Sequence, residues 1–564
     1  MKELLTITLL LISSVMLSAE QKKDWGRVSA SLESLNHIYV KDPSNGFIPS
    51  EDVEQLKDGG IFASNDYLKV DYYKGRFSAG VQVEGYFPAT VGYPLAQNRM
   101  QLSNLYVNWT DDSYSVTAGT FYDQLGSGLL FRSWEDRKLG LNNAIAGARA
   151  RYSYKDMFSV KVFGGVPRMG KISSTAFMTG AVETPFFGLG LTDVAVAAGD
   201  LSVSLSECFG WKSFSLALEG SLLYKHEDLE DNMIARGCSE NTIGWSARLN
   251  MDADGFYLRG EYVDAGMQVT ENPFIPAQRG NAQLVEFGYN RRGLGVSVTG
   301  RRLYNMFQQI GRKDNFNYPA EANVLSYRPA MCTQYTYMLT TLVPYEPLDR
   351  SYDSPVDEIG GQIDAFYNFR RGTLLGGKRG MRVHANYSSY YTCNVDGFDG
   401  VVKDRKFLFR DFSVDIEKQF TRKFKAMVLY SLQEHNSWKK GSDGDFLYVG
   451  MSHTFVADLL YKWTDTFSTR LELQYLSTRG YEKDWMAGLL EVNFAPHWSV
   501  YASDMYNHGG SGRHYYNAGV SFSMKWLHIA AGYGRYRAGY ICSGGVCRTI
   551  PAYTGANLTL TATF

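Results

Sequence analysis

The densest group of chemically capable side chains in the sequence lies between Gly126 and Gly140. Within this segment, Arg132, Trp134, Glu135 and Arg137 share a window of six residues. A guanidinium group binds oxyanions through two parallel hydrogen bonds, and an indole ring offers a face for stacking. If the segment folds into a channel, these side chains could clamp a solute. If it stays on the surface, it forms a loop that neutralises its own charge, and the sequence leaves both interpretations open.

A second set of candidates occupies the inward-facing positions of predicted β-strands, where polar side chains alternate with apolar ones. We predict that Arg149 and Arg151 join the solute contacts of the 126–140 segment. The other candidate wall residues are Glu84, Lys161, Arg259, Glu261, Glu286, Arg301, Arg470 and Glu472. A channel selective for one sign of charge would show a ring of that sign. Because both signs are mixed here, the set predicts a water-facing wall with cross-strand ion pairs, or a contact surface for an inserted loop.

Catalytic and metal-binding patterns are weak. The nine histidines are dispersed, and no nucleophile motif of the Gly-x-Ser-x-Gly type accompanies them. His453 falls on the outward face of its predicted strand, as a lipid-active enzyme would require, but no outward serine pairs with it convincingly. No second close cysteine pair or His-x-x-x-His group indicates zinc. We therefore expect no enzymatic activity, no metal and no cofactor.

The six cysteines are compatible with an oxidising, exported environment. Cys542 and Cys547 enclose Ser-Gly-Gly-Val, a short and flexible spacing from which we predict a local disulfide. The pairing of the remaining cysteines cannot be deduced from the sequence. These are Cys208, Cys238, Cys332 and Cys393.

The elements that must position these side chains are predicted to be β-strands. Along the chain, a polar turn is followed by an aromatic residue and then by alternating apolar and polar residues. Lipid requires an apolar outer face, and aromatic rings with polar edges prefer the headgroup level. The recurrence therefore favours membrane-spanning strands over a soluble sandwich. Eight aromatic residues follow turns in this way: Phe77, Tyr114, Phe158, Phe214, Phe256, Phe424, Phe467 and Trp498.

The connections between the predicted strands indicate how the sheet closes. Eleven short turns alternate with connections that are mostly longer, among them 42–63, 123–141, 166–191 and 304–356. This asymmetry is typical of antiparallel up-and-down barrels of bacterial outer membranes. We predict an all-β transmembrane barrel of about 24 strands, within a range of about 20 to 26. Alternation begins near Gly26, so we expect no plug domain before the first strand.

The two ends of the chain support export and membrane assembly. Met1–Ala19 has a charged start, an apolar stretch and small residues before a cut, and is predicted to be a signal peptide. Residues 20–564 would form the single barrel, with long extracellular loops. Leu558, Leu560 and the terminal Phe564 alternate with threonines, as in a final barrel strand. We expect a bacterial outer-membrane location with both termini on the periplasmic side.

Composition excludes several classes of protein. The chain has 57 basic and 58 acidic side chains, and this balance gives no electrostatic attraction for nucleic acid. A helical membrane protein needs repeated apolar runs of about 20 residues, and only the N-terminus approaches one. The mean hydropathy of −0.26 arises from averaging a lipid-facing and a water-facing set of positions.

Part of the sequence resembles a known family. The residues that carry the resemblance run from Asn65-Asp66-Tyr67-Leu68-Lys69, through Gly126-Ser127-Gly128 and Leu139-Gly140, to Arg149. Over roughly residues 24–170 the chain resembles an uncharacterised family of predicted outer-membrane β-barrel proteins from Bacteroidota. The resemblance implies an exported barrel in the outer membrane. It brings no established substrate or active site.

Three functions follow from these observations in decreasing order of support. The first is a porin-like barrel that gives solutes a passive or weakly selective path, restricted by the 123–141 and 304–356 connections. The second is a non-conducting barrel that serves as an accessory or anchor in an outer-membrane secretion or surface-assembly complex. The third, and weakest, is a lipid-active barrel enzyme. The expected partners are outer-membrane lipid, together with small solutes or an outer-membrane protein complex, and no nucleic acid.

Overall fold

The computed structural model describes most of the chain between Trp25 and Phe564. The described residues are 25–49, 56, 60–93, 100–168, 188–268, 276–306, 310, 325–330, 332–342, 357–392, 407–440, 446–480, 482–544 and 546–564. The predicted signal peptide, residues 1–19, lies outside this set, and so does Cys393.

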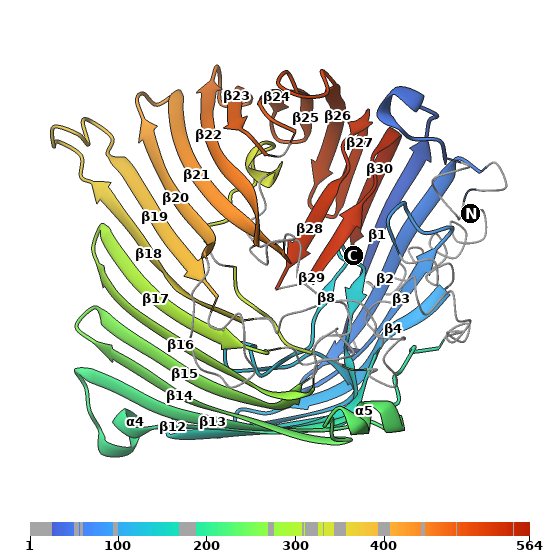
Figure 1. Ribbon diagram of the computed structural model, residues 1–564, viewed down its shortest axis with the longest axis vertical. Helices are drawn as coiled ribbons and strands as arrows, with labels where there is room; N and C mark the ends of the chain where they lie inside the picture. The colour runs from blue at the N-terminus through green and yellow to red at the C-terminus, as the bar shows by residue number, and fades with distance from the viewer. Residues whose placement is uncertain are drawn as a thin grey trace.

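The chain forms a closed antiparallel barrel of 24 strands, the number that the sequence predicts. Consecutive strands pair around the ring, and the last strand, β30, pairs with both β27 and β1. Figure 1 shows the strands side by side around this ring. The barrel strands are β1 (Arg27–Tyr39), β2 (Phe62–Lys74), β3 (Phe77–Tyr86), β4 (Met100–Thr110), β5 (Tyr114–Phe121), β10 (Ile145–Tyr154), β11 (Phe158–Pro167), β12 (Ala195–Ser204), β13 (Phe214–His226), β14 (Asn241–Ala253), β15 (Phe256–Gln268), β16 (Gln278–Arg291), β17 (Leu294–Tyr304), β18 (Asp357–Phe369), β19 (Met381–Tyr391), β20 (Phe407–Gln419), β21 (Phe424–Lys440), β22 (Phe446–Lys462), β23 (Phe467–Thr478), β24 (Trp485–Phe494), β25 (Trp498–Tyr506), β26 (His514–Met524), β27 (Leu527–Tyr536) and β30 (Tyr553–Thr563).

One end of the barrel carries the eleven short turns, and we call it the short-turn end. All eight aromatic residues that the sequence places after turns are the first residues of their strands. They therefore recur at one level around the barrel, as the sequence analysis predicts. β1 begins and β30 ends at this same end, where Phe564 and Ala30 exchange two backbone hydrogen bonds and the Phe564 ring packs on Trp526.

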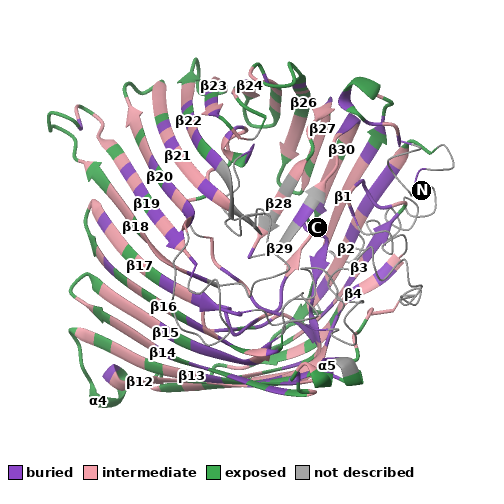
Figure 2. Ribbon diagram, in the orientation of Figure 1, coloured by how far each residue is buried: buried purple, intermediate pink, exposed green. Residues whose placement is uncertain are grey.

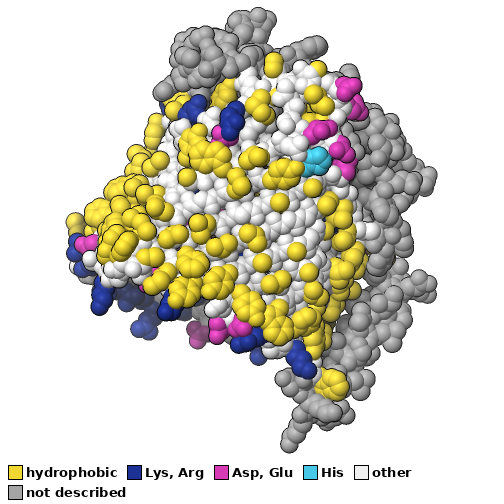
Figure 3. Space-filling model, turned by 90° about the horizontal axis from the view of Figure 1, so that it is seen from below, with side chains coloured by type: hydrophobic (Ala, Val, Ile, Leu, Met, Phe, Trp, Pro, Cys, Tyr) yellow, Lys and Arg dark blue, Asp and Glu magenta, His cyan; other side chains and the backbone are white. Residues whose placement is uncertain are grey.

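The outer surface of the barrel is apolar. On β11, for example, the outward Val160 and Val162 are exposed, whereas Lys161 between them points inward. Figure 3 shows one side of the outer wall, with hydrophobic side chains spread over its middle and charged side chains gathered at its edges. An apolar middle between two more polar edges is the surface that a bilayer requires. No helix among the described residues is long and apolar enough to cross a membrane.

The remaining elements are short and lie in the connections. Helices α4 (Leu205–Phe209) and α5 (Asp231–Ala235) lie at opposite ends of β13 (Figure 1). The other short elements are η2 (Pro43–Asn45), η5 (Thr340–Leu342), β6 (Gln124–Leu125), β7 (Phe131–Arg132), β8 (Glu135–Asp136), β9 (Leu141–Asn142), β28 (Gly539–Ser543) and β29 (Val546–Ile550). In the view of Figure 1, β8, β28 and β29 lie inside the ring of barrel strands. Figure 2 shows buried residues on the stretches of strand nearest to these inner segments.

Candidate functional site in the barrel lumen

The connection between β5 and β10 folds into the lumen, and we call its residues 124–142 the inner segment. Leu125, Leu129, Leu130 and Phe131 are fully buried and belong to one hydrophobic cluster with inward side chains of the wall. Those wall residues include Phe163, Val196, Leu223, Val263 and Leu303, from five different strands. The wall is therefore apolar on its inner face where it meets the inner segment. Apolar contact on this scale fixes the segment in place, because each buried Leu or Phe contributes about 1.5–3 kcal/mol.

A hydrogen bond holds the glycine-rich start of the inner segment against strand β15. The Ser127 backbone N–H donates to Glu261 Oε2 of β15 over 3.1 Å. Gly126 beside it has a φ of 54° and lies against Glu261 and Arg248, so a Cβ there would collide with both. The tight approach and the left-handed backbone explain why this position is glycine. The predicted wall residue Glu261 thus contacts the inserted segment.

Arg137 and Glu135 connect the other end of the inner segment to β1, β2 and β3. Arg137 Nη1 lies 2.6 Å from Glu33 Oε2 of β1, and Arg137 Nε lies 3.1 Å from Glu135 Oε1. The Arg137 guanidinium also lies over the Tyr67 ring, 4.3 Å from its centroid. Gln82 Nε2 donates to Glu135 Oε1 over 2.9 Å. In this arrangement Arg137 and Glu135 bind the wall, and their polar groups bridge the segment to three strands.

Arg132 and Trp134 lie together in the interior but differ in their surroundings. The Trp134 side chain is 7% exposed and packs with Leu139 and Leu141, so its ring contacts protein. The Arg132 guanidinium lies 4.0 Å from the centroid of the Tyr327 ring. Within the described part of the chain, Arg132 makes no ion pair with a carboxylate. Of the two arginines that the sequence singles out in this segment, Arg132 is therefore the one with a guanidinium available for a solute anion.

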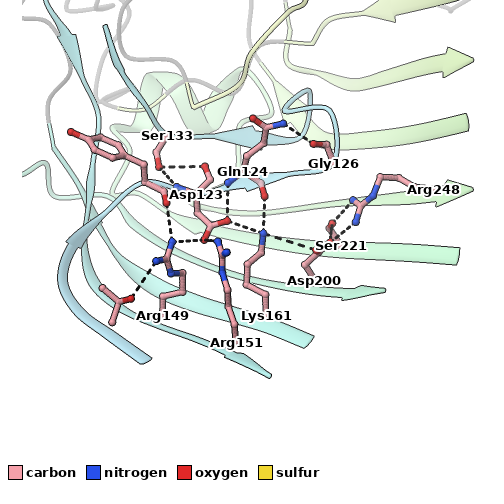
Figure 4. Close-up of polar contacts among 12 residues, drawn as sticks. Asp123, Gln124, Gly126, Ser133, Arg149, Arg151, Lys161, Asp200, Ser221 and Arg248 are labelled. Carbon is pink, nitrogen blue, oxygen red and sulfur yellow. Dashed lines mark hydrogen bonds and ion pairs between the residues drawn. The ribbon is translucent and has the colours of Figure 1, made fainter. Parts of the chain in front are cut away.

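Asp123 gathers three of the predicted cationic side chains (Figure 4). Its carboxylate lies 3.1 Å from Arg149 Nη1, 2.9 Å from Arg151 Nη2 and 2.7 Å from Lys161 Nζ. The Asp123 side chain is only 1% exposed. Burial by itself would raise the pKa of the Asp123 carboxyl, but the hydrogen bonds and charges of Lys161 and Arg151 hold it below its ordinary value. The carboxylate is therefore ionised and neutralises part of the positive charge at this point of the wall.

The ionic network continues along the wall beyond this cluster. Arg248 of β14 contacts Asp200 of β12 over 2.5 Å and Glu219 of β13 over 2.7 Å. Arg151, in contrast, keeps 48% of its side chain exposed on the inward face. The lumen beside the inner segment is therefore accessible to water. On this part of the wall, basic and acidic side chains of different strands therefore form ion pairs with one another, as the sequence pattern predicts.

A second inward segment, formed by the described residues between Leu325 and Leu342, follows the inner wall from β17 towards β24. Arg301 Nη1 of β17 donates to the Pro329 carbonyl over 2.6 Å. Tyr335 Oη donates to Asp415 Oδ2 over 2.9 Å, and the same carboxylate oxygen lies 2.6 Å from His384 Nδ1. Leu339 N–H donates to Gln474 Oε1 over 2.8 Å. The described part of the 304–356 connection is therefore folded inward, an alternative that the sequence leaves open.

The two inward segments also contact each other. Tyr327 N–H donates to the Gly128 carbonyl, and Arg132 N–H donates to the Leu325 carbonyl, each over 2.9 Å. The β28–β29 hairpin joins them, because Arg328 N–H donates to the Gly544 carbonyl over 3.0 Å. Three connections from the end of the barrel opposite the short turns thus form one constriction inside it.

The remaining predicted wall residues are distributed over separate parts of the barrel. Glu84 is buried and pairs with Arg168 over 2.8 Å, and Arg301 pairs with Glu358 over 2.5 Å. Arg470 contacts Asp458 over 2.9 Å and Glu472 over 2.7 Å. Arg259 pairs with Asp252 over 2.7 Å and lies opposite Glu286 in the β15–β16 register. These residues form local ion pairs and are not collected into one site.

The model of a family of unknown function, DUF6029, matches residues 1–564. The chain belongs to this family. Among the curated proteins, none matches the chain.

Several solved outer-membrane proteins are similar to the chain at low identity. The siderophore receptor PirA from Pseudomonas aeruginosa is 8% identical, with a TM-score of 0.41 over 96% of this chain and 82% of that chain. The translocation pore of the P pilus usher PapC is 9% identical, with a TM-score of 0.42 over 95% and 99%. A mutant porin of Rh. blastica is 14% identical, with a TM-score of 0.25 over 62% and 100%. These likenesses concern the fold alone.

The strand register adds one observation to the question of catalysis. His453 lies on the outward face of β22, and Ser477 of β23 is directly opposite it. The sequence pattern did not indicate this pair. His453 Nδ1, however, lies 2.9 Å from Tyr430 Oη, and among the described residues no hydrogen bond joins it to Ser477. A nucleophile and its base need such a bond, so this pair does not form a catalytic arrangement as it stands.

The cysteines and possible metal ligands can be placed in part. Cys542 and Cys547 are opposite each other in the β28–β29 hairpin, which brings their backbones together, and the disulfide between them stays a prediction. Cys208 is exposed, whereas Cys238 and Cys332 are buried. In the described ranges, no group of three or more His, Cys, Asp or Glu side chains is placed to hold a metal ion.

Sequence reasoning missed the residue at the centre of the ionic cluster, Asp123. It lies just beyond the end of β5, outside the alternating pattern that identified the wall residues. One signal could have indicated an inserted segment. On β13, Leu222 is exposed outward and Leu223 is buried inward. Towards the end that lies away from the short turns, the strand is therefore apolar on both faces. A wall that faced only water would not be apolar on its inner face.

Proposed function

We propose that this chain is a bacterial outer-membrane β-barrel that gives small hydrophilic solutes a weakly selective path through a narrowed lumen. The observation that carries the proposal is the water-accessible ionic wall next to the constriction, with Arg151 half exposed beside the buried Asp123. A closed barrel with an apolar exterior and an aromatic level at the short-turn end fits this location. In this orientation the short-turn end faces the periplasm.

The number of strands predicts a lumen that is wide unless internal segments fill part of it. Barrel diameter grows with strand number, and barrels of about 16 to 18 strands already leave an aqueous channel. A barrel of 24 strands without internal segments would therefore be wider than a general porin. The inner segment and the 325–342 segment reduce this bore, so the side chains on them control what passes.

The test is planar-bilayer recording of the purified protein. A conducting barrel gives discrete current steps, whereas a barrel that acts only as an accessory stays silent. One observation favours the accessory role as a second candidate, namely the dry packing of Leu125, Leu129 and Leu130 against the wall. Silent bilayers, together with a partner protein that is retained on mild extraction, would replace the channel proposal with this one.

Removal of the two positive charges of the inner segment is expected to change ion selectivity. In the Arg132→Ala/Arg137→Ala variant, the reversal potential in a salt gradient should shift towards cation preference, because two guanidinium groups leave the constriction. The matched control is Arg76→Ala/Lys155→Ala, which removes two positive charges at short turns. Equal shifts of the reversal potential in both variants, or no shift in the first, would show that the inner segment does not determine ion selectivity.

We also propose that the barrel acts without catalysis. Purified protein is expected to hydrolyse no phospholipid, because Ser477 and His453 lack the hydrogen bond that activates a serine nucleophile. Release of fatty acid from phospholipid vesicles measures this directly. Turnover that is lost in Ser477→Ala but retained in Ser452→Ala, a serine on the inward face of β22, would assign an enzymatic role instead.

A further inference from the structure

A group of arginines lies at the short-turn end of the barrel, on two hairpins that are neighbours around the ring. The β16–β17 and β18–β19 turns and the start of β19 carry the residues that we call the arginine crescent. Its members are Arg292, Arg370, Arg371, Arg379 and Arg382. These hairpins and the connection that forms the inner segment belong to opposite ends of the barrel strands.

The arginine crescent lines a pocket. A cavity of about 420 Å³ opens between the ends of β18 and β19, and all five arginines belong to its lining. Tyr367 and Tyr387 face outward, so Asn368 and Arg382, at alternate positions of the same two strands, face inward. Both inward residues are nevertheless exposed to solvent. The pocket therefore borders the mouth of the lumen and is accessible to water there.

The positive charge of the pocket is only partly compensated by protein groups. Arg382 lies opposite Glu417 in the β19–β20 register and interacts electrostatically with Asp415. Glu417 is the one carboxylate in its lining, and Lys425 Nζ already lies 2.8 Å from Glu417 Oε2. None of the five arginines makes an ion pair with a carboxylate in the part of the chain that the structure describes. Five like charges around one cavity repel one another, and a bound anion would relieve this repulsion.

The chemistry of the lining defines the class of anion. Guanidinium groups present paired N–H donors that match the oxygens of phosphate and carboxylate groups. Several guanidinium groups around a small cavity fit a compact anion with more than one charge better than an extended acidic protein surface. We propose that the arginine crescent binds a phosphate-bearing anion at the short-turn mouth, either a free solute or the headgroup phosphate of a membrane lipid.

The test uses inorganic pyrophosphate as the probe and the full-length barrel in detergent. Isothermal titration should give saturable binding to the unaltered protein, weakened about tenfold or more in Arg370→Gln/Arg371→Gln/Arg379→Gln, since each lost charge-assisted bond contributes to affinity. The matched control is Lys155→Gln/Lys212→Gln/Lys525→Gln, which removes three positive charges at other short turns. It should bind pyrophosphate as the unaltered protein does. Binding in detergent requires no conduction, so this result stands apart from the channel proposal.

Two further measurements identify the source of the phosphate, and a second variant keeps the test valid if the first does not fold. If the source is a lipid, native mass spectrometry should show phosphatidylglycerol retained by the unaltered protein and lost from the Gln variant. If the source is a solute, the barrel in nanodiscs that contain phosphatidylglycerol should bind pyrophosphate with the same affinity as the barrel in nanodiscs of neutral lipid. Should the Gln variant fail to assemble, the Arg370→Lys/Arg371→Lys/Arg379→Lys variant keeps the charge but loses the paired donors, and weaker binding is still expected.

Three results would overturn the proposal. One is equal loss of pyrophosphate binding in the two Gln variants, which would indicate an effect of overall charge. Another is the absence of both pyrophosphate binding and retained anionic lipid in the unaltered protein. The third is binding of polyglutamate without binding of pyrophosphate, which would assign the crescent to an acidic protein partner.

Discussion

Replacement of residues 124–142 by a short Gly-Ser linker is expected to raise the single-channel conductance several-fold. The inner segment fills part of a lumen that is enclosed by 24 strands, and the conductance of a pore is set by its narrowest section. Because the 325–342 segment remains, the enlarged pore should still be narrower than an empty barrel of this size. If the native protein is silent in bilayers, the same deletion should convert it into a conducting barrel.

The control for this deletion retains the length of the segment and removes only its anchors. In Leu129→Ala/Leu130→Ala, both side chains that pack in the dry cluster are shortened, which should weaken docking by about 4 kcal/mol or more. Recordings should then show brief transitions to the larger conductance of the deletion variant. Conductance of the deletion variant equal to that of the native barrel would show that the inner segment does not limit the pore.

The barrel itself could be predicted from the sequence because lipid imposes a strict pattern on it. Phe77, Tyr114 and the other aromatics after turns each begin a strand, since the same interface recurs every two strands. The alternation of apolar and polar residues then assigned Lys161 and Glu261 to the inward face correctly. Both signals are local, and neither requires knowledge of the tertiary structure.

The interior was less predictable because its contacts join residues that are far apart in the chain. Glu33 meets Arg137, and Ser127 meets Glu261, across separations that no periodic pattern encodes. The arginine crescent was missed for a related reason. Each hairpin carries only a few basic residues, and their convergence becomes visible only when the order of strands around the barrel places the hairpins side by side.

Trp134 shows the limit of assigning chemistry from residue types alone. An indole within a charged, glycine-rich segment indicates a surface for stacking, and its neighbours Arg132 and Tyr327 do stack with one another. The Trp134 ring also takes the Arg132 guanidinium on its face, 5.6 Å from the centroid, but it packs with Leu139 and Leu141 and so helps to fold the segment itself. The residues that bury it come both from this segment and from Tyr327 and Ile541 of other connections, so its burial depends partly on contacts that the local sequence does not encode.

Asp123→Asn is expected to destabilise the barrel by about 3–5 kcal/mol, the usual cost of removing one partner from a buried ion pair. The variant leaves Arg149, Arg151 and Lys161 facing one another around a neutral amide, with their positive charge uncompensated. The loss is measured as the change in the free energy of unfolding in urea. The unfolded fraction at each urea concentration is read from the slower migration of the unfolded barrel on cold gels. The same excess of positive charge should shift the reversal potential towards anion preference.

The control and the pH dependence make the role of the carboxylate specific. Asp252→Asn removes a carboxylate that is half exposed and paired with Arg259, so it should cost about 1 kcal/mol or less. Because the pKa of Asp123 is lowered in the folded barrel, its stabilising contribution is complete above the unfolded pKa of about 4 and is lost as the pH falls through the folded pKa. The native barrel should therefore lose stability at acidic pH more steeply than Asp123→Asn. Equal acid sensitivity in both proteins would show that Asp123 does not hold this part of the wall together.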